Sequence, residues 1–304
     1  MVKVIRLYDF KKCDLPDVLF QITVHQKDID ARIEKAAEHF LTIEDQSGEI
    51  KTGDIVAIKV ESDDSFVNSE CDRLSVGRGF YSEKVEQALL GKKSGETFTM
   101  DMDGTPAKIT VLWVKRRVVP KLTDDMAANL GVEDVATVEE YKAYVIAELE
   151  NEDKEKKQNA IWLMVSKKLL EETEFEVDES EVEAQFKKDI SYMRGELEND
   201  FEEFMRVKYH GETLEEQERN FKEEIEKTLK LCAIAAPMAE KDGIEWTEDD
   251  YNAVIDDMVN EMYTREELEA SMSYEDYVKQ QLQEYLKGKV LEYFDDRFTM
   301  TIVD

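Results

Sequence analysis

The residue types that most often carry acid–base or metal chemistry are scarce in this chain. Histidine occurs only three times, at widely separated positions: His25, His39 and His210. None of them stands in a zinc-binding HExxH motif, and the chain has no nucleophile elbow, no phosphate-binding Walker loop and no dinucleotide fingerprint. We therefore expect no catalytic residue, no cofactor and no metal ion.

The cysteines also point away from redox and metal chemistry. Cys13, Cys71 and Cys232 are odd in number and widely spaced, and they form no CxxC pair, so they predict neither a disulfide framework nor a metal site. We interpret them as buried or unreactive thiols in a reducing compartment. The start of the chain lacks the apolar core of a signal peptide, and no run of about 18 apolar residues could cross a membrane. Unless a leader has been removed, the sequence predicts a cytoplasmic protein without a membrane partner.

Carboxylates are so abundant that a chance pair of them says nothing about acid–base catalysis. The chain has 72 acidic and 40 basic residues and a formal net charge of −32. Because phosphate backbones need a basic surface, we expect no nucleic-acid partner. The acidity is spread along the chain, which favours solubility and limits self-association of a protein that exposes apolar surface. Charge alone fits any soluble acidic protein equally well.

The elements that would position functional residues fall into two kinds. A chain of 304 residues suggests about two domains at roughly 150 residues each. Residues 1–26 are predicted to be extended, and residues 27–41 carry apolar residues at helical spacing. Residues 50–115 contain short β-type runs separated by glycine turns, with one helix near 82–90, and so predict a small β-rich domain.

After Pro120 the pattern is almost wholly helical. N-cap signatures predict the starts of successive helices: Thr137 with Glu140, Asp178 with Glu181, Thr213 with Glu216, and Thr247 with Asp250. The apolar stripes drift between steps of three and four without a strict heptad, which favours hairpin arms over a coiled-coil rod. One such stripe runs from Val182 to Phe204 or Met205 and predicts a single long helix. A last helix is followed by a strand-like end over 298–303.

One stretch resembles a known enzyme domain. Residues 74–96, from Leu74-Ser75-Val76 to Ser94-Gly95-Glu96, resemble the core of the FKBP-type prolyl-isomerase domain, with a glycine turn, a short helix and a second turn. Gly53–Val60 looks like the preceding strand of that domain, and Ala107–Lys115 looks like its closing strand. The resemblance implies a pocket that takes up a proline ring and favours the twisted amide.

The residues that would form that pocket depart from the family pattern. The aromatic floor falls on Val85, the aromatic residue at the end of the first strand falls on Val60, and Val67 replaces the acidic residue expected after Phe66. The flap has shrunk to residues 103–106. The remnant pocket would comprise Phe66, Tyr81, Val85 and Leu89. Since the barrier to isomerisation is about 18–20 kcal/mol, we expect little activity from it.

Three further segments resemble trigger factors. Val119–Ala127 is similar to the junction that follows their isomerase domain, Glu174–Val182 to a segment of their helical domain, and Thr23–Asp30 to their linker. The shared order of these segments implies an α+β protein. A small FKBP-like antiparallel β domain would be inserted before an extended all-α domain with helical arms, as in the C-terminal domain of trigger factors and SurA-like chaperones.

The resemblance also implies domain boundaries. Residues 1–26 would be an extended segment that packs on the helical domain, 27–118 a linker helix with the degenerate FKBP-like domain, and 119–304 the helical chaperone domain. The Gly-Phe-Arg-x-Gly loop with which trigger factors dock on the ribosome does not occur in this sequence. We therefore expect no direct ribosome binding.

The function implied is that of an ATP-independent chaperone that holds unfolded, partly folded or nascent polypeptides in a helical cradle. Flexible methionine side chains suit a surface that accepts varied partners, and the chain has twelve of them. Candidate contacts are Trp162, Met164, Met193, Phe204, Met205, Met258, Met262 and Met272. Each of them fits an ordinary core position as well. The alternatives are a slow FKBP-type peptidyl-prolyl cis/trans isomerase and a scaffold with one dedicated partner.

Overall fold

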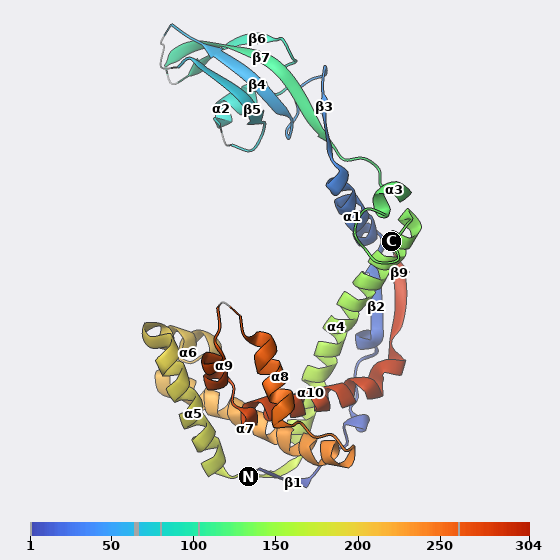
Figure 1. The fold of residues 1–304 in the computed structure, drawn as a ribbon, viewed down its shortest axis with the longest axis vertical. Helices are drawn as coiled ribbons and strands as arrows, with labels where there is room; N and C mark the ends of the chain where they lie inside the picture. Colours follow the sequence, from blue (N-terminus) through green and yellow to red (C-terminus); the bar gives the residue numbers. More distant parts are fainter. Residues whose placement is uncertain (1, 64–66, 80, 103, 261) are drawn as a thin grey trace. The chain divides into compact units, whose positions relative to one another are not determined.

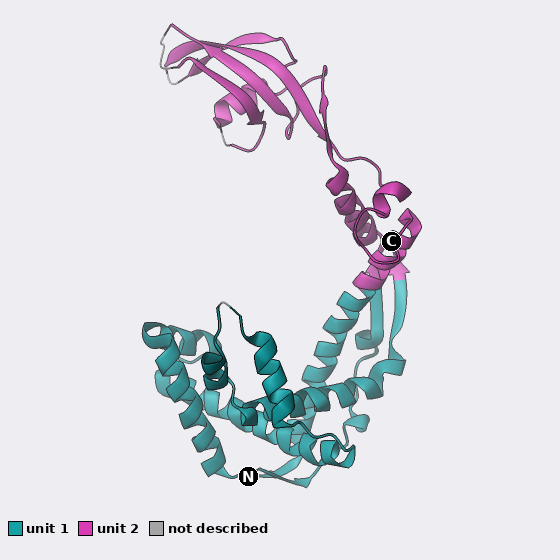
Figure 2. Ribbon diagram, viewed as in Figure 1, with its two compact units in different colours: residues 1–23, 150–301 teal, residues 24–149, 302–304 magenta. Residues whose placement is uncertain are grey.

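The computed structural model of the chain describes residues 2–63, 67–79, 81–102, 104–260 and 262–304 (Figure 1). The chain divides into two compact units (Figure 2). Unit 1 comprises residues 1–23 and 150–301, and unit 2 comprises residues 24–149 and 302–304. Each unit is therefore built from segments that are far apart in sequence.

The elements of the chain confirm the predicted α+β class, because strands and helices are largely segregated along the sequence. The strands are β1 (Lys3–Arg6), β2 (Gln21–His25), β3 (Thr42–Asp45), β4 (Ile55–Glu61), β5 (Ser69–Ser75), β6 (Thr97–Met102), β7 (Thr105–Val118), β8 (Glu174–Glu176) and β9 (Thr299–Val303). The helices are α1 (Gln26–Ala37), α2 (Glu83–Leu89), α3 (Asp124–Ala127), α4 (Val138–Glu172), α5 (Glu179–Leu197), α6 (Phe201–Tyr209), α7 (Leu214–Lys241), α8 (Glu248–Met258), α9 (Arg265–Ser271) and α10 (Tyr274–Phe294).

Unit 2 contains the predicted antiparallel sheet. Its strands lie in the order β3-β7-β4-β5, and β6 also pairs with β7. Strand β7 is long enough to pair with β6 along its first half and with β3 at its end, and its register with β4 shifts between Ala57 and Ile58. Such a shift marks a β-bulge, which bends and twists a strand. The buried face packs against α2 through Val85 and Leu89.

Unit 1 is built on a base of helices α4, α7 and α10. Ile161, Val165 and Leu169 recur every four residues along α4, and all three are fully buried in this base. Their spacing places them on one face of the helix. Cys13 and Phe20 from the N-terminal segment complete the same cluster. The N-terminal strand β1 pairs with β8 in antiparallel fashion, and β2 pairs with β9.

Two groups of helices rise from this base, and each has its own hydrophobic cluster (Figure 1). We call the first arm the group formed by α5, α6 and the N-terminal part of α7, whose cluster includes Phe186, Met205 and Phe221. We call the second arm the group formed by α8, α9 and the start of α10, whose cluster includes Tyr251 and Ile255. The prediction of helical hairpin arms is thereby confirmed.

The helix starts agree with the capping residues, but the helix ends were harder to foresee. Thr247 and Asp250 form a reciprocal capping box at the start of α8, as predicted. The single helix predicted along the stripe from Val182 to Phe204 is wrong, because the chain breaks after Leu197 and α6 begins at Phe201. Glu198 has a φ of +43° at this break, a left-handed conformation that no α-helix can continue through.

Candidate functional site

A cavity of about 430 Å³ lies in unit 1, between the first arm and the start of α10. Its apolar lining comes from two helices. Tyr209 lies at the end of α6, and Phe221, Ile225 and Leu229 recur at helical spacing on one face of α7. Tyr209 and Phe221 stack with ring centroids 4.5 Å apart. These side chains are largely buried, so the lining is the edge of the hydrophobic cluster of the first arm.

Two carboxylates face each other at this cavity. Burial raises the pKa of Asp189 above its usual value, and the nearby charge of Asp276 raises it further. Burial also acts on Asp276, but hydrogen bonds from Lys188 and Ser273 lower the pKa of that carboxyl overall. Burial raises the pKa of Tyr209 to about 12. At neutral pH the site therefore combines a protonated phenol with two neighbouring carboxyl groups.

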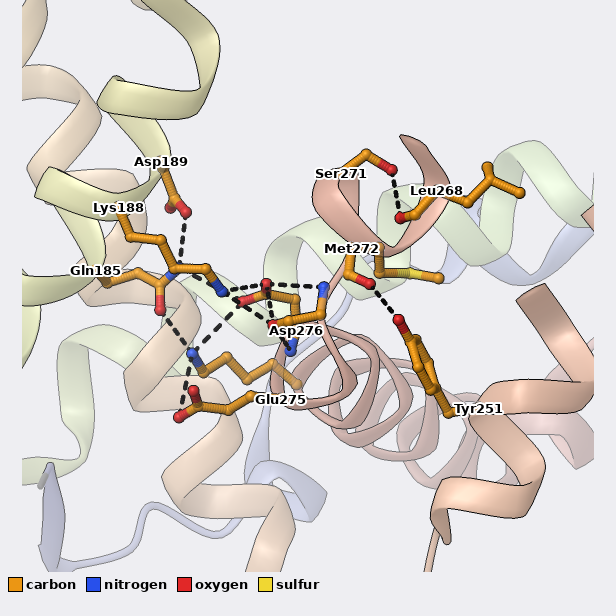
Figure 3. Close-up of polar contacts among 11 residues, drawn as sticks. Gln185, Lys188, Asp189, Tyr251, Leu268, Ser271, Met272, Glu275 and Asp276 are labelled. Atoms are coloured by element: carbon orange, nitrogen blue, oxygen red, sulfur yellow. Dashed lines mark hydrogen bonds and ion pairs between the residues drawn. The ribbon is translucent and has the colours of Figure 1, made fainter. Parts of the chain in front are cut away.

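A network of polar side chains joins α5 to the start of α10 across this cavity (Figure 3). Lys188 Nζ lies 2.6 Å from Asp276 Oδ2 and 2.9 Å from Ser273 Oγ. Gln185 accepts a hydrogen bond of 2.7 Å from Lys279 Nζ and donates one of 2.8 Å to Asp189. The network uses long side chains on both helices, because the two backbones belong to different arms.

The tip of the second arm exposes a run of apolar side chains. They lie within ten residues on α8 and the following loop: Val254, Met258, Val259, Met262 and Tyr263. Asn260 shapes this loop, because its side-chain oxygen accepts hydrogen bonds from the backbone N–H groups of Met262 and Tyr263. Met262 in this loop is 78% exposed. Exposed apolar side chains that gather in one place mark interaction sites in soluble proteins.

The contacts predicted in the first arm lie in its cluster and not on its surface. Met193 and Phe204 are half-buried against this cluster. Met205 has an exposure of 0%, so it stabilises the arm and cannot touch a polypeptide in this conformation. Met205 lies at the end of the apolar stripe that begins at Val182, and this stripe forms the core of the arm.

The remaining predicted contacts are divided between the second arm and α4. Met258 and Met262 are exposed at the tip of the second arm, whereas Met272 is half-buried and its carbonyl accepts a hydrogen bond of 2.8 Å from the Tyr251 hydroxyl. On α4, Trp162 packs against the base cluster and Met164 is exposed. The structure therefore distributes the predicted contacts over several surfaces instead of gathering them on one.

Sequence reasoning missed several of the most exposed apolar side chains in unit 1. Leu163 is 70% exposed and Val207 is 62% exposed. Leu163 lies two residues after the buried Ile161, and Val207 lies two residues after the buried Met205. A shift of two residues places a side chain on the opposite face of a helix. An apolar residue that falls outside the core stripe could therefore have been recognised in the sequence as an exposed one.

Of the described residues of the remnant isomerase pocket, Val85 and Leu89 are packed into the core and do not line an open pocket. Val85 and Leu89 are buried at 1% and 0% exposure in the core of the sheet. Tyr81 is exposed, and its hydroxyl lies 3.2 Å from Ser69 Oγ. Phe66 lies outside the described residues. The neighbouring Glu86 is buried and fixes the preceding loop by accepting hydrogen bonds from the N–H groups of Gly77, Gly79 and Tyr81.

Within the part of the chain that the structure describes, no group of three or more His, Cys, Asp or Glu side chains is arranged to hold a metal ion. None of the described helices is both long enough and apolar enough to span a bilayer. Burial raises the pKa of the Cys232 thiol to about 11, which keeps it protonated near neutral pH.

The chain is similar to a set of known proteins. The family model "Bacterial trigger factor protein (TF) C-terminus" matches residues 137–294. The trigger factors of Shouchella clausii and Clostridioides difficile are each 26% identical to it over 291 residues, covering 88% of this chain and 66% of their own length. The trigger factor of Mycolicibacterium vanbaalenii is 28% identical over 249 residues, which cover 75% of this chain and 52% of that protein.

A solved structure described as "Promiscuous Substrate Recognition in Folding and Assembly Activities of the Trigger Factor Chaperone" aligns with 98% of this chain and 73% of its own, at a TM-score of 0.46 and 18% identity. The chain spans slightly less than two thirds of the length of the first two trigger factors, 66% in each case. The region that the family model matches holds both arms and all of α4, and it is more than half of the chain. The chain therefore belongs to the bacterial trigger factor family.

Proposed function

We propose that this chain is an ATP-independent chaperone that holds unfolded or partly folded polypeptides, including nascent chains, on the helical unit 1. The observation that carries this proposal is the apolar tip of the second arm, where Met258, Met262 and Tyr263 are exposed within a few residues. An unfolded chain offers apolar segments of no fixed shape, and flexible methionines adapt to such segments. The names of the trigger factor relatives support the same role.

The high charge of the chain fits this role. Apolar tips on an uncharged protein would promote self-association, whereas a net charge of −32 keeps copies of the chain apart. The same charge disfavours nucleic acid as a partner. Docking on the ribosome is not part of the proposal. A reducing, cytoplasmic setting is proposed on the basis of the three cysteines, none of which forms a disulfide.

We also propose the predicted division into an N-terminal segment of residues 1–26, a region of 27–118 and a chaperone domain of 119–304. Contacts within unit 1 support the predicted packing of the N-terminal segment on the helical domain. Strand β1 pairs with β8, and the Val2 N–H donates a hydrogen bond of 2.8 Å to the Glu181 carboxylate. The extended N-terminal segment thus contributes to the fold of the helical domain.

An aggregation assay tests the chaperone function. Guanidine-denatured glyceraldehyde-3-phosphate dehydrogenase is diluted into buffer with increasing amounts of the chain, and light scattering is recorded. We expect suppression of scattering without ATP at near-stoichiometric amounts. Unchanged scattering, at concentrations where a known chaperone suppresses it, would overturn the proposal.

The alternative, a slow prolyl isomerase, makes a different prediction. Refolding of a protein that is limited by proline isomerisation would be accelerated, and a Tyr81→Ala variant would lose the acceleration. The burial of Val85 and Leu89 argues against this outcome, because a proline ring has no access to them. A dedicated scaffold would instead retain one stoichiometric partner in a pull-down.

A further inference from the structure

A second cavity of unit 1, of about 450 Å³, lies between the N-terminal segment and the ends of α7 and α10. It is distinct from the cavity beside the first arm, since no residue lines both. Its walls are partly aromatic, with Phe10 from the N-terminal segment and Tyr285 and Tyr293 from α10. The rings of Phe10 and Tyr293 meet edge to face with their centroids 5.8 Å apart. Tyr293 is 47% exposed, so part of this aromatic wall is open to a ligand.

The charged residues of this cavity are mostly basic. Three lysines line it, Lys11, Lys241 and Lys289, against two carboxylates, Asp242 and Glu292. The whole chain has the reverse balance, with 72 acidic and 40 basic residues. Both carboxylates lie near the same lysine, because Lys289 Nζ is 2.8 Å from Asp242 Oδ2 and 3.7 Å from Glu292 Oε2. Within the described part of the chain, Lys11 and Lys241 have no carboxylate at ion-pair distance.

Local structure fixes where these two ammonium groups lie. The Asp9 side chain accepts a hydrogen bond from the Lys11 backbone N–H and so begins the short 3₁₀ helix Phe10–Lys12. Lys11 Nζ lies 5.3 Å from the centroid of the Tyr293 ring, a cation–π contact that holds it at the aromatic wall. Lys241 is the last residue of α7, where a cation also favours the negative end of the helix dipole.

Asp242 does not cancel the basic character of the cavity. Its Oδ2 atom lies 2.8 Å from Lys289 Nζ and accepts a hydrogen bond of 2.8 Å from the Tyr285 hydroxyl. The hydrogen bond from Lys289, followed by that from Tyr285, lowers the pKa of this carboxyl, so Asp242 is ionised at neutral pH and is matched by Lys289. The Glu292 side chain is 75% exposed, and solvent screens its charge. Lys11 and Lys241 therefore supply a positive charge that the cavity itself does not neutralise.

We propose that this cavity binds acidic segments of client polypeptides in which an aromatic or aliphatic residue lies next to glutamate or aspartate side chains. The apolar residue packs against the rings of Phe10 and Tyr293, and the carboxylates pair with Lys11 and Lys241. The proposal rests on the function proposed above and adds a class of client segment to it. The tip of the second arm does not suit such segments, because exposed carboxylates lie among its apolar side chains, at positions 256 and 257.

The variants that test this proposal change charge and leave the packing intact. Lys11→Met combined with Lys241→Met removes both unpaired ammonium groups and keeps the length of the side chains. The matched control combines Lys12→Met with Lys227→Met, which removes the same charge from the same two helices. Neither Lys12 nor Lys227 lines the cavity, and each forms an ion pair with a nearby carboxylate of its own segment.

Binding is measured by fluorescence anisotropy of two labelled peptides with the full chain. One peptide carries a phenylalanine flanked by glutamates, and its twin has glutamine in place of each glutamate. The parent should bind the glutamate peptide more tightly than the glutamine peptide. The variant without Lys11 and Lys241 should lose about threefold to tenfold in affinity for the glutamate peptide, since each exposed ion pair contributes little. The control should match the parent within about twofold, and the loss should shrink as salt rises from about 50 mM to about 500 mM.

Carbodiimide cross-linking locates the bound glutamate peptide, because the reagent joins a carboxylate to an amine only where the two groups touch. Mass spectrometry of the digested product should find the cross-links mainly at Lys11 and Lys241, and less often at Lys12 and Lys227. Cross-links that lie mainly at other lysines would overturn the assignment of the site.

Other results would also overturn the proposal. Equal losses in the two double variants would mean that overall charge, and not this cavity, determines the affinity. Equal affinity of the parent for both peptides would show that the cavity does not select carboxylates. Sedimentation velocity gives a further check: self-association of the parent at low salt that is lost with Lys11 and Lys241 would assign the cavity to a second copy of this acidic chain.

Reduced, carboxyamidomethylated lactalbumin, a permanently unfolded protein, separates this proposal from the chaperone function. If the parent binds this protein but does not distinguish the two peptides, the chaperone function stands and the acidic subsite is refuted. If the glutamate peptide binds through Lys11 and Lys241 while unfolded lactalbumin does not bind, the chaperone function fails and the cavity remains a site for acidic peptides.

Discussion

Two methionines that look alike in sequence should respond in opposite ways to substitution. Met205 has an exposure of 0% in the cluster of the first arm. Replacing a fully buried methionine by alanine removes the transfer free energy of the lost atoms and leaves a cavity, at a cost of about 2–5 kcal/mol. Met205→Ala should therefore lower the free energy of unfolding of unit 1 by that amount. The affinity of the molecules that remain folded should change little.

Met262 is 78% exposed at the tip of the second arm, so it contributes little to stability and is free to contact a client. Full burial of such a side chain yields about 1.5–3 kcal/mol, of which a client can recover roughly three quarters. Met262→Ala should thus weaken client binding by about 1–2 kcal/mol, a factor of roughly five to thirty in the dissociation constant. Its free energy of unfolding should stay within about 0.5 kcal/mol of the parent value.

The free energy of unfolding is measured by urea denaturation followed by circular dichroism. The dissociation constant for a client is measured by fluorescence anisotropy of a labelled, permanently unfolded protein, reduced and carboxyamidomethylated lactalbumin. Binding of both variants is measured without urea, where each variant is expected to be folded. The reasoning is refuted if Met262→Ala lowers stability by more than Met205→Ala does. It also fails if Met262→Ala leaves the dissociation constant unchanged while the parent binds the probe.

Three further predictions concern the sheet of unit 2 and the thiols. Glu86→Ala deprives several backbone N–H groups of their acceptor and should destabilise unit 2 by about 3 kcal/mol in urea melts, whereas Glu83→Ala on the same helix should change little. Asp54 is 1% exposed, and burial alone would raise the pKa of its carboxyl, but the hydrogen bond from Arg116 brings the pKa below its usual value. The stability that the Asp54–Arg116 pair contributes is therefore full above the usual aspartate pKa. It is lost as the pH falls through the lowered pKa. Asp54→Asn should therefore cost about 2 kcal/mol at pH 7 and clearly less at pH 3, and an equal loss at both values would contradict this. An aromatic disulfide reagent at pH 8 should modify Cys71 first, whereas Cys13 and Cys232 should react only on unfolding because both are buried. Burial also raises the pKa of the Cys232 thiol to about 11, which keeps it protonated at that pH.

The sequence predicts those parts of the fold that depend on local chemistry. The capping residues at Thr213 and Thr247 mark the first turns of α7 and α8, because a side-chain oxygen there accepts a backbone N–H that no helical carbonyl can reach. The sheet of unit 2 follows from short β-branched runs between glycine turns. The helix α9 was not foreseen. It is only seven residues long, and its capping box of Thr264 and Glu267 lies too close to the end of α8 to be separated from it by periodicity.

The break between α5 and α6 shows why a continuous apolar stripe does not guarantee a continuous helix. Phe186 and Ile190 on α5 and Phe201 and Met205 on α6 all enter the same cluster. The hydrophobic effect rewards burial regardless of whether one helix or two supply the side chains. The break itself falls at Glu198, which has a φ of +43° although it is not a glycine.

The proposed client contacts use side chains that the packing of unit 1 does not use, and this explains which residues the sequence could not assign. Periodicity finds Ile161 and Met205 because burial requires the same face at every turn. It gives no separate signal for Leu163 and Val207, which lie on the opposite faces of the same helices and are among the most exposed apolar residues of unit 1. Single exposed apolar residues are common on soluble proteins, so exposure by itself does not assign them a role. The proposed function assigns Leu163 and Val207 to contacts with client polypeptides, which need exposed apolar side chains and not buried ones.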